Sequence, residues 1–298
     1  MTIQQVIDKI IAYHPDLGER LAATCDTVKY GDTSKECTGV ATAIYPSPDV
    51  IRAAGEAGCN LLVVHEPSFY GHMDPLDWLR GNETAEKKMA LLDAYGIVLF
   101  RDHDRIHAHV PDGIFYGLFA ELGWLSYLDQ PLDVPTDPGQ PLIRTLTLPD
   151  IPVAKIAAMF KEKLGLKAVR FTGNPGTIVR KAALAAHLFP NQQKLIEAIE
   201  REKIDLLIPG EIIDWEVPCY FKDAGQLGLN KACLHLGHFN MEELGMKYAV
   251  NWLRELAPGL PVVYCPNEDM YRYFSLFNGR IRRKPLAMTV RGFLTVEK

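Results

Sequence analysis

Histidine and carboxylate residues follow three short apolar runs of the sequence, at the points where these runs end. In an open α/β sheet, ligand sites lie beyond the carboxyl ends of the strands, so polar residues there are the first candidates for chemistry. The candidate residues are His65 and Glu66, His107, and His238 and Glu242. Imidazole and carboxylate groups are the ligands that hold zinc, iron or manganese in proteins. The pattern predicts a shared metal site. On the pattern alone, the alternative is that the histidines are unrelated to one another and only form hydrogen bonds.

The third of these clusters leads directly into a stretch with helical spacing. Asn240 has the residue type of a helix N-cap, and Glu243, three residues later, is the matching partner of a capping box. We therefore expect the helix to begin after Asn240, which leaves Glu242 free to turn its carboxylate toward the strand end. An acidic residue near a helix N-terminus is also stabilising by itself, so Glu242 alone does not establish a metal site.

Two more polar residues follow predicted strands and are candidates for a role beside the metal ligands. His187 ends the run Ala-Ala-His, and Glu211 follows Leu-Leu-Ile-Pro-Gly. Either residue could orient a ligand through a hydrogen bond, transfer protons or contact substrate. His235 lies inside an apolar run instead, and we expect it to be a hydrogen-bonded core histidine.

The elements that must position these residues alternate between strand-like and helix-like patterns. Apolar runs bounded by turn residues span 39–44, 60–64, 96–100, 181–186, 204–208 and 231–236. Stretches with helical spacing span 48–57, 85–95, 153–164, 192–203 and 241–256. Such alternation predicts an α/β protein built of βαβ units, with mixed and largely parallel sheets.

The length of 298 residues favours two lobes. A proline-rich polar stretch, residues 129–139, breaks both periodicities and is the predicted linker. The first lobe would span 1–130 and carry the first two clusters. The second would span 131–298 and carry the third cluster. In an alternative arrangement, its C-terminal segment packs back on the first lobe. The metal site would then lie in the cleft between the lobes.

Charge and composition exclude several classes of partner. Hydrophobic residues make up 48% and charged residues 23% of the chain, and the net charge is -5. This charge gives no general attraction to nucleic acid or anionic lipid. Charged side chains interrupt residues 1–23, and no apolar run reaches membrane-spanning length, so we expect neither a signal peptide nor a membrane segment.

Cysteine spacing and missing motifs narrow the chemistry further. The six cysteines contain no C-x-x-C pair, which argues against a thiolate zinc site or a disulfide framework and favours the reducing cytoplasm. The sequence has no G-x-G-x-x-G, P-loop or G-x-S-x-G motif. Dinucleotide binding, P-loop NTPase activity and serine hydrolysis are therefore not supported.

The motifs, taken in order, resemble those of the Nif-three-like family, dinuclear metal-centre proteins often labelled GTP cyclohydrolase 1 type 2. The similarity spans most of the chain. Its segments are Cys25-Asp-Thr-Val-Lys-Tyr-Gly31, Ser47-Pro-Asp-Val-Ile-Arg-Ala-Ala54, His65-Glu66-Pro67, His103-Asp-Arg-Ile-His107, Pro209-Gly210-Glu211 and Gly237-His238-Phe-Asn-Met-Glu242. The last segment is the most specific single match.

The resemblance implies two divalent ions, zinc, iron or manganese, held by five residues. These are His65, Glu66, His107, His238 and Glu242. Two of them differ from the family pattern, because Glu66 stands in place of a histidine and His107 in place of an aspartate. Both types coordinate metal and the total ligand charge is kept, so we expect the dinuclear site to survive. In the alternative only one ion binds, and His103 or Asp104 substitutes as a ligand.

Such a site is suited to hydrolysis, because divalent ions lower the pKa of water and stabilise developing charge. We expect Glu242 to bridge the ions, Glu211 or His187 to transfer protons, and the substrate to be a small nucleotide-like or heterocyclic molecule. In a second hypothesis the protein is not an enzyme, and the ions stabilise the lobe interface of a structural or protein-interaction module. The resemblance also implies a homohexamer, and a cytoplasmic location is expected.

Overall fold

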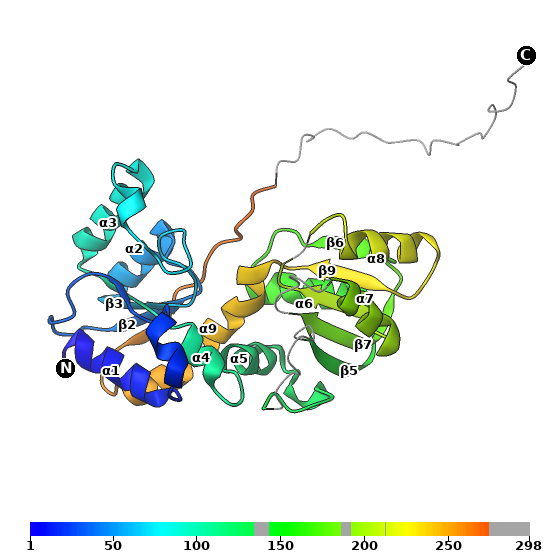
Figure 1. Cartoon of the computed structure of the whole chain (residues 1–298), viewed down its shortest axis with the longest axis horizontal. Helices are drawn as coiled ribbons and strands as arrows, with labels where there is room; N and C mark the ends of the chain where they lie inside the picture. Colours follow the sequence, from blue (N-terminus) through cyan, green and yellow to red (C-terminus); the bar gives the residue numbers. More distant parts are fainter. Residues whose placement is uncertain (134–142, 186–191, 212, 274–298) are drawn as a thin grey trace, which may run out of the picture.

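The computed structural model describes residues 1–133, 143–185, 192–211 and 213–273 (Figure 1). These residues form two lobes, each built around a five-stranded mixed sheet with helices packed on it. The predicted α/β class, with mixed and largely parallel sheets, is confirmed. Among the described helices, none has the length and apolar character needed to cross a membrane.

The first sheet gathers strands from both ends of the chain. Its spatial order is β1 (Val28–Tyr30), β4 (Val98–Arg101), β3 (Leu61–Val64), β2 (Val40–Ala43) and β10 (Val262–Tyr264). All pairs are parallel except β1 with β4. The strands β2, β3 and β4 are buried at every position, which explains why the sequence shows them as continuous apolar runs. Because β10 joins this sheet, the segment that follows α9 packs on the first lobe.

Helices cover both faces of the first sheet. They are α1 (Ile3–Tyr13), η1 (Gly18–Ala23), α2 (Pro48–Glu56), η2 (Asp77–Leu79), α3 (Glu83–Tyr95) and α4 (Asp104–Ala108). The side chains of Ser47 and Asn82 cap α2 and α3 at their N-termini. A capping box between Thr2 and Gln5 begins α1, which was not predicted. The helices α2 and α3 pack on one face, whereas α1 and part of α9 pack on the other (Figure 1).

The second sheet has parallel strands at its centre and antiparallel strands at its edges. Its order is β5 (Ile143–Pro152), β7 (Ile178–Ala185), β8 (Leu206–Pro209), β9 (Ala232–His235) and β6 (Arg170–Gly173). The three central strands are the ones that the sequence predicted. Both edge strands were missed, because most of their residues are only partly buried or exposed and neither strand has a continuous apolar run.

The second lobe is likewise covered on both faces. Its helices are α6 (Val153–Leu164), α7 (Gln192–Arg201) and α8 (Val217–Gln226). The predicted α6 has the expected bounds, and its buried stripe faces the core that it shares with the central strands. The helices α7 and α8 cover the opposite face. The predicted lobe boundary near residue 130 follows η3 (Leu125–Tyr127) and runs into residues 134–142, which lie outside the described residues, so it stays a prediction.

Two helices connect the lobes, α5 (Gly113–Leu122) and α9 (His238–Leu256) (Figure 1). In α9, Met241 and Leu244 belong to the core of the second lobe, whereas Ala249 and Leu253 belong to the core of the first. The two helices approach at glycines, since a Cβ atom added at Gly245 would lie 2.7 Å from the carbonyl oxygen of Ile114. The N-terminus of α9 is therefore held firmly between the lobes.

Candidate metal centre

The candidate residues meet where strands of the two sheets end. His65 and Glu66 follow β3, while His103 and His107 stand at the start and in the body of α4, which follows β4. From the other lobe, Glu211 follows β8, and His238 and Glu242 lie in the first turns of α9, after β9. The strand-end rule therefore located residues of both lobes that the tertiary structure brings together.

One part of the cluster joins two carboxylates to two imidazoles. The Nε2 atom of His238 lies 2.5 Å from Glu66 Oε1 and 3.1 Å from Glu242 Oε2. The same Glu242 oxygen lies 3.3 Å from Nε2 of His65. All four side chains are at least four-fifths buried, with exposed fractions from 0 to 19%. Four of the five predicted ligands are thus in mutual contact across the lobe interface.

The other part of the cluster is a group of three imidazoles. The ring of His65 is stacked on His103, with centroids 4.5 Å apart, and meets His107 edge-on at 4.9 Å. The three residues each offer a nitrogen within 4.8 Å of those of the other two. His107, the fifth predicted ligand, therefore belongs to the cluster, together with His103, which had been considered only as a substitute. A single Nε2 atom binds one ion, so His65 can serve only one part of the cluster.

An oxygen acceptor lies at Nδ1 of every histidine in the cluster. His65 Nδ1 donates to the carbonyl oxygen of Asp102 at 3.0 Å, which leaves its Nε2 as the unprotonated, ligating atom in the neutral ring. Nδ1 of His107, His103 and His238 lies 2.7 to 2.9 Å from a carboxylate oxygen of Asp112, Asp104 and Glu211, respectively. Carboxylate or carbonyl partners at one nitrogen are typical of metal-binding histidines, because they fix the ring orientation and raise its basicity.

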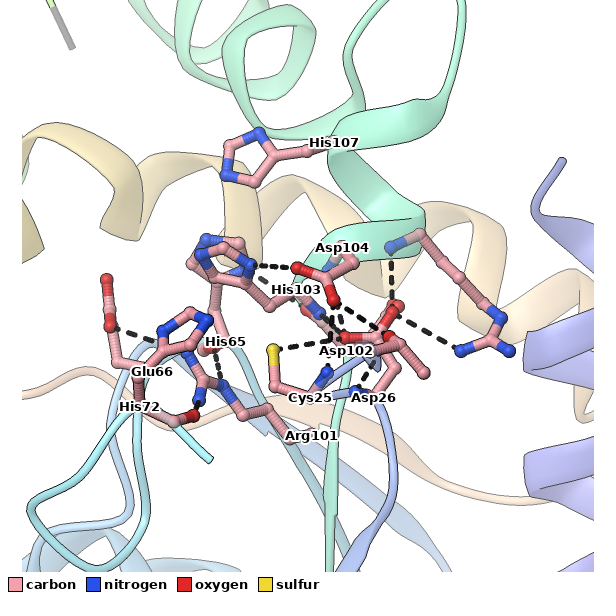
Figure 2. A network of polar contacts seen from close by, with 12 residues as sticks. Cys25, Asp26, His65, Glu66, His72, Arg101, Asp102, His103, Asp104 and His107 are labelled. Carbon is pink, nitrogen blue, oxygen red and sulfur yellow. Dashed lines mark hydrogen bonds and ion pairs between the residues drawn. The ribbon is translucent and has the colours of Figure 1, made fainter. Parts of the chain in front are cut away.

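Asp26 and Asp104 hold the start of α4 in place, as Figure 2 shows. The Asp26 carboxylate accepts hydrogen bonds from the backbone amides of residues 103, 104 and 105. One Asp104 oxygen faces His103 Nδ1. The other oxygen accepts hydrogen bonds from Thr24 Oγ1 and from the backbone amide of Cys25. Both Asp104 oxygens are engaged, so Asp104 orients the ring of His103, and its role as a substitute ligand stays a prediction. Sequence reasoning missed Asp26 and Asp112, although Asp26 stands in the first family-like segment.

The buried carboxylate of Glu242 is the strongest sign that the cluster holds a cation. Glu242 is 1% exposed, and neither of its oxygens has a hydrogen-bond partner of good geometry among the described residues. Burial would raise its pKa, but His238 and His65 hold the pKa well below its ordinary value, so the group is ionised. An ionised carboxylate without hydrogen bonds is costly in the interior unless a charge compensates it. The donor set therefore fits divalent ions.

Metal binding is expected to tighten as the pH rises from 6.5 toward 9. Burial lowers the pKa of His107, but the Asp112 carboxylate outweighs burial, so that in the metal-free protein the pKa rises to about 9. An arriving ion must displace that proton, and affinity should increase by up to about tenfold per pH unit for each proton displaced. A competition titration with a chromophoric chelator at pH 6.5, 7.5 and 8.5 measures this slope.

The stability of the metal-free protein should change in the opposite direction. The contribution from the raised pKa of His107 is fully present below the ordinary value of 6.5 and is lost as the pH rises through about 9. For the chelator titration, a His107→Gln variant serves as the control, since its affinity for metal should depend less on pH. A wild-type affinity that is constant across this range would contradict the assignment of His107 as a ligand.

Several expectations around the cluster need correction or stay open. Asn240 is not an N-cap: α9 begins at His238 with Gly237 as its cap residue, and the Asn240 side chain donates to the carbonyl of Leu236 instead. Glu243 makes no capping box, because its carboxylate accepts from Tyr264 and Asn267. Glu242 nevertheless faces the strand ends, since it lies one turn after His238. His187 lies outside the described residues.

Comparison with known proteins identifies the family of the chain. A family model described as Duf34/NIF3 (NGG1p interacting factor 3) matches residues 1–269. A GTP cyclohydrolase 1 type 2 homolog from Clostridium perfringens is 26% identical over 217 residues, which are 71% of this chain and 76% of the relative.

Solved structures share the fold. A hypothetical protein of Staphylococcus aureus has a TM-score of 0.64 at 16% identity, with 92% of this chain and 99% of that chain covered. A Bacillus cereus protein related to NIF3 has a TM-score of 0.63 at 14% identity, with the same two shares covered. Reduced HcgD from Methanocaldococcus jannaschii has a TM-score of 0.57 at 19% identity and covers 89% of this chain and 98% of its own.

Proposed function

The chain belongs to the Duf34/NIF3 family, and on that premise we propose that it is a metal-dependent hydrolase of a small molecule. The observation that carries the proposal is the ionised, buried Glu242 carboxylate, which faces Nε2 of His65 and Nε2 of His238 but has no hydrogen bond of good geometry among the described residues. A carboxylate in this position is suited to bridge two cations. The name of the Clostridium perfringens relative, GTP cyclohydrolase 1 type 2 homolog, favours a nucleotide-like or heterocyclic substrate.

The proposed ligands divide into two groups, each with a member next to Glu242. His65, His103 and His107 offer imidazole nitrogens in the first group, and Glu66 and His238 offer an oxygen and a nitrogen in the second. Two divalent ions, zinc, iron or manganese, fit this set better than one, because a single ion takes four protein ligands in most zinc sites. Bound there, the ions would supply an activated water and stabilise developing negative charge.

Glu211 is the proposed proton-transfer group. Its Oε1 atom lies 2.7 Å from Nδ1 of His238, and its side chain is 34% exposed, so it borders both the cluster and solvent. A partly exposed carboxylate at the edge of the cluster can accept a proton from a reacting water and release it. It also fixes the orientation of the His238 ring. His187 stays a prediction for the same role, as do the homohexamer and the cytoplasmic location.

The test combines metal analysis with a substrate panel. Purified protein is loaded with zinc, iron(II) or manganese, its metal content is measured, and phosphoester, amide and heterocyclic substrates are screened. We expect about two ions per chain and turnover of one substrate class that stops when a chelator removes the metal. Glu211→Gln should keep its metal and lose kcat by about 100-fold, the lower range for a general acid or base.

Two outcomes would contradict the proposal. One ion per chain at full occupancy would disprove the dinuclear site. Full metal loading without product from any substrate class, combined with a large rise in melting temperature on loading, would favour the second hypothesis, in which the ions stabilise the lobe interface of a non-catalytic module.

A further inference from the structure

A cavity of about 620 Å³ opens beside the cluster of candidate ligands, on the second lobe. Its wall includes Glu211 and His238, so a molecule inside it reaches the cluster. The cavity also borders the carboxyl ends of β8 and β9, where ligands bind in open α/β sheets. Its volume lies in the range of pockets for small molecules.

A segment from the first lobe closes one side of this cavity. After β10 the chain leaves the first sheet and runs toward the second lobe (Figure 1), where the amide of Lys167 donates to Asp269 at 3.3 Å. The Tyr273 hydroxyl donates to the carbonyl oxygen of Ala168 at the same distance. The cavity wall is therefore complete only when the lobes and this segment are assembled.

The lining of the cavity carries charges of both signs. Arg170 and Arg272 line it, as does Glu211, whose carboxylate lies next to His238. Among the described residues, Arg170 forms an ion pair only with Asp214, at 3.7 Å, and both side chains are more than half exposed. Such a pair is weak and a bound anion can replace it. For Arg272, no ion pair is found within the described part of the chain.

A buried histidine on the wall supplies an unused polar atom. His235 is 8% exposed, its Nε2 atom lies 2.9 Å from Thr172 Oγ1, and its Nδ1 atom has no hydrogen-bond partner among the residues that the structure describes. Burial and the charge of Arg170 lower its pKa to about 4, so the ring is neutral at pH 7. An unpaired buried nitrogen costs free energy that a ligand donor or acceptor would recover. The sequence had predicted a satisfied core histidine, and the structure satisfies only one of its two nitrogens.

Two aromatic side chains complete the wall. Tyr271 and Tyr273 border the cavity and are 64% and 47% exposed. Exposed phenol rings beside arginines are suited to pack on a planar ring, whereas the arginines bind the anionic group of the same molecule.

We propose that this cavity is the substrate pocket and that it binds a planar ring carrying a phosphate or carboxylate group. Arg170 and Arg272 hold the anionic group, the two tyrosines pack on the ring, and the opposite end of the molecule lies at His238. The inference rests on the proposed function for the identity of the reacting end, but the binding of the anion and ring does not require metal.

The experiment uses the full chain, metal-free and zinc-loaded, with phenylphosphonate as the probe, because its P–C bond resists hydrolysis. Isothermal titration compares it with methylphosphonate, which lacks the ring, and phenol, which lacks the anion. We expect metal-free wild type to bind phenylphosphonate at least about tenfold more tightly than either fragment. Arg170→Met and Arg272→Met should each weaken this binding about tenfold.

Arg180→Met is the matched control, because Arg180 is an exposed, ion-paired arginine of the same lobe that does not line the cavity. The Arg180→Met variant should bind phenylphosphonate as tightly as the wild type does. Equal losses in all three variants, or binding that needs zinc and ignores both cavity arginines, would overturn the proposal, as would phenol binding as tightly as phenylphosphonate. Arginine-dependent binding by a protein that takes up no metal would support the pocket and reject the hydrolase.

Discussion

Replacing Glu242 by glutamine is expected to weaken divalent metal binding by more than about 100-fold. Loss of a partner that only orients a ligand costs about 10- to 100-fold, and Glu242 is a direct ligand candidate placed between both parts of the cluster. Glutamine has nearly the same shape, so the core around this residue should keep its packing. Metal content after dialysis and a competition titration measure the effect, and hydrolysis should fall with the metal.

Glu243→Gln is the control for this change. Glu243 is the next residue in α9 and is also buried, at 3% exposed, but its carboxylate accepts hydrogen bonds from Tyr264 and Asn267, away from the cluster. This variant should lose some stability and keep its metal. If both variants bind metal as the wild type does, Glu242 is not a ligand. If both lose it equally, the effect comes from α9 as a whole.

Replacing Gly245 by alanine is expected to destabilise the protein by about 2 kcal/mol and to weaken metal binding. Alanine in a helix would by itself gain about 1 kcal/mol, so a net loss can come only from the contact with α5. The added Cβ atom would lie 2.8 Å from the Cα atom of Ile114, too close without a backbone shift, and overpacking costs about 1 to 3 kcal/mol. A shift of α9 also moves Glu242, three residues earlier in the same helix.

Denaturant unfolding and metal titration of the Gly245→Ala variant measure both effects. Gly71→Ala is the control, since a Cβ atom there meets only Pro75 at an ordinary 3.5 Å. A Gly245→Ala variant that is more stable than wild type would show that the α5 and α9 contact tolerates separation. Lost stability with unchanged metal affinity would show that the N-terminus of α9 moves independently of this contact.

The site places ionised groups where they cost stability. Glu66 and Glu242 carry depressed pKa values despite burial, because His238 and His65 lie against them. In buried ion pairs of this kind, the attraction between the charges offsets little more than the free-energy cost of removing them from water. The cluster is therefore better explained by what it binds than by the stability that it gives the metal-free chain.

Sequence periodicity located the parts of the fold that are buried on both faces. The continuous apolar runs of β2, β3 and β4 were predicted within two residues of their ends, because each strand is covered by helices on both sides. The helix α5 was missed for a related reason. It contacts both lobes and buries six of its ten residues, so it has no single apolar face to reveal its period.

Residue type alone identified the candidate ligands but not all of their partners. His65, His238 and Glu242 could be named from strand ends and motif, since strand ends of one sheet edge converge. His103 was only a substitute in the sequence, yet its ring is stacked on His65. Asp112 could not be assigned, because its contact with His107 depends on how the chain turns between α4 and α5.

The sequence by itself determined which residues could bind a metal and that they follow strands, because ligand chemistry and strand burial are local properties. The tertiary structure decided which of them meet. Glu66 and His238 lie 172 positions apart in the chain and touch only because α9 passes from one core to the other. Its true start at His238, and not at Asn240, follows from that packing, since burial against two lobes outweighs the preference of one capping side chain.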